Sequence, residues 1–236
     1  MKNSLIEPQE IPSQGSDILN ASFKRRSFLQ YAGAGLAGVA LIAAGCKKEQ
    51  VSHDMGEGVD LGSGDIGILN YAYALEQLEA AFYAAVIQNP YANMPANELA
   101  LLTDIRDHEL AHREFFKAAL SSKAIPALEV NFSSINFSSR DSVLGTAKVF
   151  EDLGVSAYNG AGKLIQSKEY LLLAGKIVSV EARHAALIRD LLENGSFANS
   201  EVIDMNGLDK ARTPKEVLTM AQSFIKTTIN ASSLPS

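Results

Sequence analysis

The 236-residue sequence has no tryptophan, a single cysteine and only four histidines. One cysteine excludes an internal disulfide and a thiolate metal cluster. Positive charge is also scarce, because 21 Lys and Arg stand against 27 Asp and Glu. The resulting formal net charge of −6 argues against a nucleic-acid partner. Hydrophobic residues still make up 47% of the chain, enough for one buried core of ordinary domain size.

The first 46 residues have the features of an export signal. Lys24, Arg25 and Arg26 precede an apolar, glycine-rich run over residues 31–45. This run is shorter than the roughly 20 residues that a membrane-spanning helix needs. A positive segment, a short apolar segment and a small-residue end are typical of a secretory signal. The paired arginines resemble the twin-arginine (Tat) signal, although Lys24 and Gln30 depart from its usual pattern.

The segment Ala43-Ala44-Gly45-Cys46 resembles a lipobox, where bacterial lipoproteins are cut and lipidated on the cysteine. Ala43 stands where leucine is commonest, but the lone cysteine of the chain falls at the required position. We therefore expect residues 1–46 to be a signal peptide read by the Tat export machinery. The mature chain would be lipid-anchored to a membrane at Cys46, in the periplasm or cell envelope. Residues 47–64 include four glycines and should form a flexible tether.

The rest of the chain predicts an all-α fold, with no convincing strand. Helical patterns cover residues 65–88, 96–122, 141–166 and 168–193. Residues 196–236 should form a loop and a short helix that starts after Thr213 and ends near Lys226. The connection between the second and third helices is longer than those within each pair. Two helical hairpins joined by a crossover are therefore expected, as in one form of four-helix bundle.

Two of the expected helices carry the same metal-binding pattern. Glu109 and His112 lie three residues apart, and Glu181 and His184 repeat this spacing. On a helix, both side chains of each pair leave the same face one turn apart. A carboxylate and an imidazole placed in this way can bind one metal ion together.

The other two helices share a second pattern. Glu76 is followed seven residues later by Tyr83, and Glu151 is followed seven residues later by Tyr158. The motifs recur in the same order in both halves, so a pseudo-twofold axis would bring four glutamates and two histidines together. Buried carboxylates are costly unless they are paired or bind metal. Four carboxylates and two neutral imidazoles would balance two divalent cations and suit iron or manganese.

Residues 75–83, 108–112, 150–158 and 180–185 resemble the exported bacterial ferritin-like domain proteins. These belong to the wider ferritin, bacterioferritin and rubrerythrin superfamily, and the resemblance covers residues 65–195. It implies a ferritin-like four-helix bundle that binds two Fe or Mn ions and acts as a ferroxidase or peroxidase on O2 or peroxide. The ligands that it implies are Glu76, Glu109, His112, Glu151, Glu181 and His184.

Glu79 has more than one interpretation, because it lies one turn after Glu76 on a similar face. It could be a direct ligand, a base beside the ligands or a replacement for Glu76. The internal repeat favours Glu76, since Gly154 stands at the position of the second half that matches Glu79.

Two alternatives stay open. His108-Glu109-x-x-His112 matches the HExxH helix of zinc metalloproteases, in which both histidines bind zinc and the glutamate is the general base. That interpretation gives no role to Glu181 and His184. The other alternative is a metal-free bundle kept as a structural or binding module. A small homo-oligomer is compatible with the sequence, whereas a tether and a lipid anchor do not suit a closed storage cage.

Overall fold

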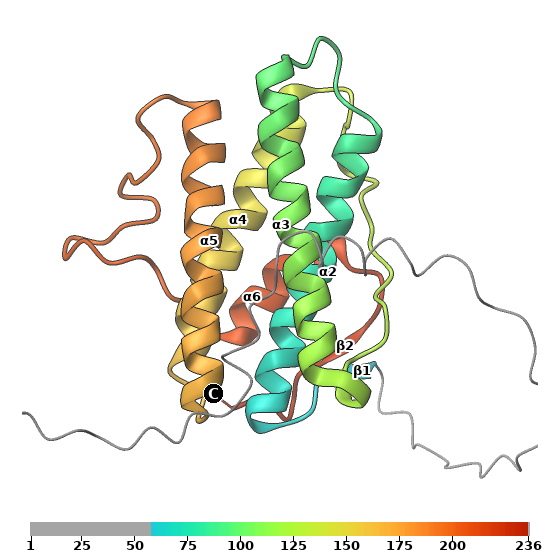
Figure 1. The fold of residues 1–236 in the computed structure, drawn as a ribbon, viewed down its shortest axis with the longest axis vertical. Helices are drawn as coiled ribbons and strands as arrows, with labels where there is room; N and C mark the ends of the chain where they lie inside the picture. Colours follow the sequence, from blue (N-terminus) through green and yellow to red (C-terminus); the bar gives the residue numbers. More distant parts are fainter. Residues whose placement is uncertain (1–57, 236) are drawn as a thin grey trace, which may run out of the picture. The chain divides into compact units, whose positions relative to one another are not determined.

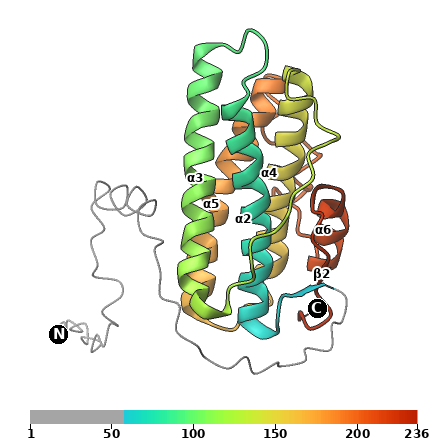
Figure 2. The ribbon, with the colours of Figure 1, turned by 90° about the vertical axis from the view of Figure 1, so that its right-hand side faces the viewer.

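The computed structural model describes residues 58–235, and four long helices form a bundle there (Figure 1). The helices α2 and α3 pair as one hairpin, and α4 and α5 pair as the other. The short helix α6 packs on α4 (Figure 2). These elements confirm the predicted fold class. Their bounds are α2 Gly64–Gln88, α3 Ala96–Leu120, α4 Arg140–Gly162, α5 Lys168–Leu192 and α6 Pro214–Ala221, with 3-10 turns η2 Ser121–Lys123 and η3 Gln222–Phe224.

A crossover joins the two hairpins and runs along the bundle from the end of α3 to the start of α4 (Figure 2). Two buried amide side chains of α2 hold it in place. Asn70 accepts a hydrogen bond from the backbone N–H of Ile125 at 3.0 Å. Gln77 accepts one from the backbone N–H of Leu128 at 2.9 Å. Because buried backbone groups need partners, these two amides hold the first part of the crossover, residues 123–128.

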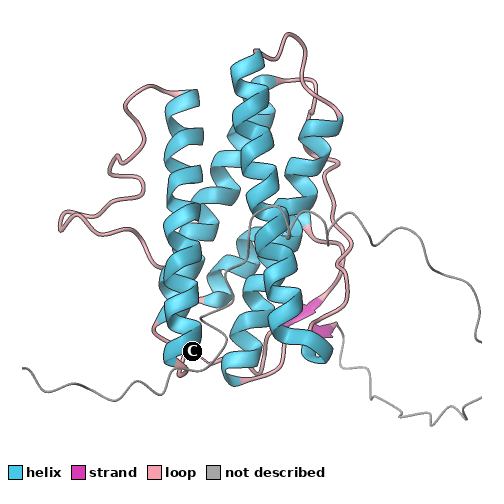
Figure 3. Ribbon diagram, viewed as in Figure 1, coloured by secondary structure: helices cyan, strands magenta, loops and turns pink. Residues whose placement is uncertain are grey.

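A sheet of two short strands joins the segment before α2 to a segment near the end of the chain (Figure 3). It corrects two predictions, the absence of strands and the extent of the flexible tether. Strand β1 (Val59–Asp60) pairs in parallel with strand β2 (Ile229–Asn230), where the sequence predicts no strand. Leu61, directly after β1, is completely buried. The end of the predicted tether therefore belongs to the folded domain. A two-residue strand is too short to show the alternation by which strands are recognised.

Helix ends differ from the predicted bounds mainly at the C-termini. The helix α4 ends at Gly162 rather than near residue 166, and α6 ends at Ala221 rather than near Lys226. The predicted capping box at Thr213 and Glu216 does form. No helix within residues 58–235 is both long and apolar enough to span a bilayer. The predicted signal peptide and Cys46 lie outside the described residues.

Candidate metal centre

Acidic and histidine side chains from all four long helices meet inside the bundle. On α3, Glu109 lies on the same buried stripe as Leu102, Ile105 and Phe116, so packing of that apolar stripe turns the carboxylate inward. On α5, Glu181 and His184 share a stripe with Ile177 and Ile188. The helix α2 is buried on nearly every face, and α4 contributes one further carboxylate. The side chains that converge are Glu76, Glu109, His112, Glu151, Glu181 and His184.

The donor atoms of these six residues fall into two groups with two members in common. Glu109 and Glu181 belong to both groups. The first group is completed by Glu76 and His112, and the second by Glu151 and His184. Within each group, one donor atom from each residue lies within 4.8 Å of all the others. The grouping follows the pseudo-twofold relation between the two hairpins that the repeat predicts.

Each histidine directs its Nδ1 atom at carboxylates of other helices. His112 Nδ1 lies 2.8 Å from Glu181 Oε1 and 3.5 Å from Glu76 Oε2. His184 Nδ1 lies 2.9 Å from Glu109 Oε1 and 3.5 Å from Glu151 Oε2. The two halves therefore have nearly the same geometry, and in each half the carboxylate nearest to the histidine belongs to a glutamate shared by both donor groups.

Most of these donor atoms are buried without a hydrogen-bond partner. Among residues 58–235, nine buried side-chain atoms lack one: the Tyr71 hydroxyl and eight atoms of the six converging residues. The 2.8 Å approach of His112 to Glu181 is an ionic contact, because the ring N–H does not point at the oxygen well enough for a hydrogen bond. Native interiors leave few buried polar groups unsatisfied. Cations would satisfy all eight atoms, and the mixed oxygen and nitrogen donor set fits Fe or Mn.

Carboxyl groups outnumber imidazoles in the cluster, and they shift the pKa values of both histidines. Burial lowers the pKa of His112, but the carboxylates of Glu181 and Glu76 outweigh burial and raise it to about 11. Burial is likewise outweighed at His184, where Glu109 and Glu151 raise the pKa to about 12. In the absence of metal both imidazoles therefore carry a second ring proton and are positively charged. A metal ion that binds here must displace that proton, because only the neutral imidazole is a ligand.

Each non-shared carboxylate is held by a tyrosine of the opposite hairpin. Tyr83 on α2 donates a hydrogen bond of 2.5 Å to Glu151 Oε1. Tyr158 on α4 donates to Glu76 Oε1. In both glutamates the other oxygen, Oε2, faces the cluster without a hydrogen-bond partner. The two copies of the glutamate–tyrosine pattern are therefore linked to each other across the hairpins, and not within one helix.

His108 lies outside both donor groups. Its Nδ1 atom is 2.9 Å from His184 Nε2, and the two rings are nearly parallel, at an angle of 8°. Because His184 uses Nδ1 toward the carboxylates, this contact on its other nitrogen fixes the orientation of the ring. A zinc protease helix would turn His108 and His112 toward one ion. The observed direction of His108 therefore leaves the HExxH hypothesis without its second ligand.

Glu79 is buried beside the cluster but belongs to neither donor group. A Cβ atom built on Gly154 would lie only 3.1 Å from Glu79 Oε1, so the glycine makes room for this carboxylate. Burial raises the pKa of Glu79 well above its ordinary value, and the negative charge of Glu109 is the second-largest cause. The structure thus places Glu79 as a fifth buried carboxylic acid, next to the four glutamates and two histidines that converge.

One protein-family model matches the chain, and its description is "Ferritin-like domain". The match covers residues 64–194, which is more than half of the chain and includes the four long helices. The six converging residues and Glu79 all lie within the matched range. No curated protein matches the sequence.

Proposed function

Because the chain belongs to the Ferritin-like domain family, we propose that its six converging side chains bind two Fe or Mn ions and that the loaded site is a redox centre. The sharing of Glu109 and Glu181 between two donor groups supports this most directly. A carboxylate has two oxygens, so each shared glutamate can bridge two cations and hold them as a pair. Glu76 with His112, and Glu151 with His184, would complete the two coordination sets.

The residues around the ligands have separate tasks in this proposal. Tyr83 and Tyr158 hold one oxygen of the terminal carboxylates and leave the other oxygen for the metal. His108 orients His184 through its outer nitrogen. The complete burial of the four glutamates keeps bulk water away from the centre. When bound, the metal pair would supply one-electron chemistry and open coordination positions for O2 or peroxide.

The reaction that we propose is the oxidation of Fe(II) in pairs. In that reaction two Fe(II) ions would be oxidised to Fe(III), and O2 would take up the two electrons with two protons and leave as hydrogen peroxide. With hydrogen peroxide as oxidant, the same two electrons and two protons yield two molecules of water. The chain has one cysteine and therefore no rubredoxin-like iron site. A cycle that keeps the same two ions bound would therefore need two electrons from another molecule to reduce them again.

Elemental mass spectrometry of residues 47–236, purified without chelator or nickel, tests the proposal. We expect about two Fe or Mn ions per chain, because two donor groups are present. Glu109→Gln should lose both ions, whereas Glu114→Gln, an exposed position of the same helix, should keep them. About one zinc ion per chain would favour the protease alternative. No bound metal, even after anaerobic addition of Fe(II) and Mn(II), would contradict the proposal and favour a structural or binding module.

A further inference from the structure

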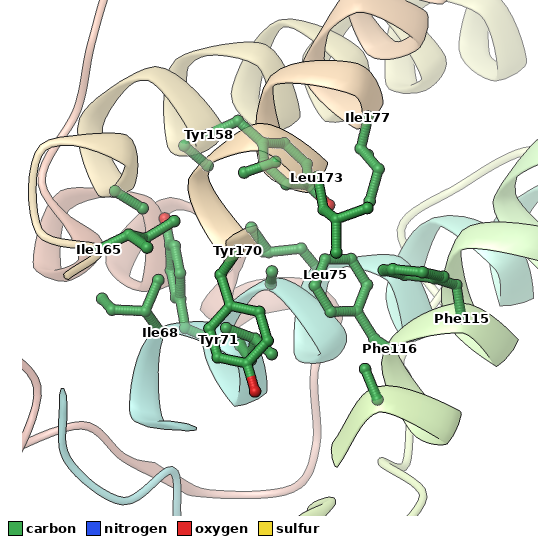
Figure 4. A pocket seen from close by; sticks show the side chains of 16 residues that line it. Ile68, Tyr71, Leu75, Phe115, Phe116, Tyr158, Ile165, Tyr170, Leu173 and Ile177 are labelled. Atoms are coloured by element: carbon green, nitrogen blue, oxygen red, sulfur yellow. The ribbon is translucent and has the colours of Figure 1, made fainter. Parts of the chain in front are cut away.

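A narrow apolar cavity of about 40 Å³ lies among the four long helices (Figure 4). Its surface is almost entirely carbon. Phe115 is exposed and Tyr170 is partly exposed, which places the mouth of the cavity between α3 and α5. The lining includes small side chains, among them Ala161 and Ala174, that leave the space open.

The register of the helices places this cavity directly next to the candidate metal centre. On α2, α3 and α5, one lining residue stands four positions from a proposed ligand, which is one helical turn or about 5.4 Å along the axis. On α4, Tyr158 lines the cavity and also donates its hydroxyl to Glu76. The three lining residues one turn from ligands are Ala72, Phe116 and Ile177.

The cavity is poorly suited to polar occupants. A buried water molecule needs two to four polar partners. Among the lining side chains, the Tyr158 hydroxyl is already donated to Glu76, which leaves the hydroxyls of Tyr71 and Tyr170 as possible partners. Hydrogen peroxide would lose its hydrogen bonds to water on entry without regaining them, which is unfavourable. An apolar diatomic molecule has no such cost and gains from leaving water.

We propose that this cavity is the site through which O2 approaches the metal centre, and that O2 rather than peroxide is the oxidant. The inference rests on the proposed function, because it names the co-substrate of that centre. The small volume fits a diatomic gas and excludes larger organic substrates. Tyr158 separates the cavity from Glu76, so O2 held there would lie one side chain away from a proposed ligand.

Xenon binding tests the cavity without any metal, because dry apolar cavities in proteins take up xenon. Metal-free crystals of residues 47–236 under xenon pressure should show the gas among the lining residues. Ala174→Leu should fill the cavity and abolish this binding. Ala186→Leu is the matched control: it is also a partly buried alanine of α5, but it lines a different cavity. Absence of xenon from the wild-type cavity would overturn the proposal.

Oxidation kinetics test the route. With O2 as oxidant, Ala174→Leu should slow Fe(II) oxidation by about tenfold and raise the KM for O2, whereas the rate with hydrogen peroxide should stay within about twofold. Ala161→Leu is a second cavity-filling variant on α4, in case one of them folds poorly. Equal slowing with both oxidants, or no slowing with either, would contradict the O2 route. Fe(II) binding without oxidant is measured first, so a failure of the proposed function shows there and not in the oxidant comparison.

Discussion

At the level of single residues, the four completely buried glutamates are the most unusual feature of the fold. Burial and mutual repulsion make such a group unfavourable unless cations or protons balance it. Tyr83 and Tyr158 supply neutral donors, and two histidines supply positive charge in the metal-free protein. The arrangement is therefore built to accept cations at a cost in stability without them.

Metal content of two conservative variants separates the roles of Glu76 and Glu79. Glu76→Gln removes a proposed ligand and should lower the content by about one ion per chain, since one donor group is left incomplete. Glu79→Gln should leave about two ions, because Glu79 belongs to neither donor group. Both are measured by elemental analysis after dialysis against metal-free buffer. Loss of an ion from Glu79→Gln alone would show that Glu79, and not Glu76, is the ligand.

The residues that converge could be predicted from the sequence because a local spacing is repeated in both halves of the chain and the motifs resemble those of a known family. Glu109 and His112 share a helix face through their three-residue separation alone. The contact of His108 with His184 could not be predicted, since it joins residues 76 positions apart. The tyrosine–glutamate bonds could not be predicted for the same reason, because the seven-residue spacing relates each tyrosine only to the glutamate of its own helix, whereas the bonds join opposite hairpins.

At the level of helices, a charged cluster ties the ends of three elements together. Arg140, the first residue of α4, donates to Glu98 on α3 at 2.7 Å and to the carbonyl of Leu191 on α5 at 2.8 Å. Tyr91, in the loop before α3, also donates to Glu98. The cluster fixes the end of the bundle at which both the α2–α3 loop and the crossover arrive.

Glu98→Gln should destabilise the protein in a pH-dependent way. The guanidinium of Arg140 lowers the pKa of Glu98 below its ordinary value of 4.5. The ionised carboxylate therefore stabilises the fold above pH 4.5, and this contribution is lost as the pH falls through the lowered pKa. We expect a loss of about 1–2 kcal/mol at pH 7, kept modest because Arg140 is partly exposed. Urea unfolding at pH 7 and pH 3.5 measures it, and a difference that stays constant would contradict the assignment.

A glycine of α4 marks a close contact between the bundle and the segment that precedes α6. A Cβ atom on Gly160 would lie 1.7 Å from the backbone oxygen of Arg212. Gly160→Ala should therefore destabilise the protein by about 1–3 kcal/mol, because backbone must move to make room. Gly175→Ala on α5, where no atom lies within 4 Å, should instead stabilise it by about 0.5–1 kcal/mol. Thermal melting compares the two; equal effects would show that Arg212 shifts freely.

At the level of the whole molecule, the sequence predicted the fold class and the number of long helices because apolar residues recur at three- and four-residue steps over long stretches, and Pro-, Asn- and Gly-containing loops separate these stretches. It did not predict the path of the crossover. The first part of that path depends on Asn70 and Gln77, polar residues on a helix that is buried nearly all round. Nor did it predict β1 and β2, since two-residue strands form only when the rest of the domain brings them together.

We propose that the chain is exported by the Tat pathway and anchored by a lipid on Cys46, in keeping with the arginine pair and the lipobox resemblance. Cys46→Ser should move the protein from the membrane fraction to the soluble envelope fraction, because the acyl chains are lost. Replacing Arg25 and Arg26 together by lysine should retain it in the cytoplasm. Fractionation and immunoblotting check both, and a Cys46→Ser protein that stays with the membrane would contradict the anchor.

The crossed hydrogen bonds from Tyr83 to Glu151 and from Tyr158 to Glu76 have an evolutionary consequence. Each half of the chain carries the residue that positions a carboxylate of the other half. A substitution of one partner leaves the other buried without its hydrogen bond, which selection penalises. The two halves of the repeat are therefore not free to diverge independently. In homologous sequences each tyrosine should change together with the glutamate of the opposite hairpin, and not with the glutamate of its own helix.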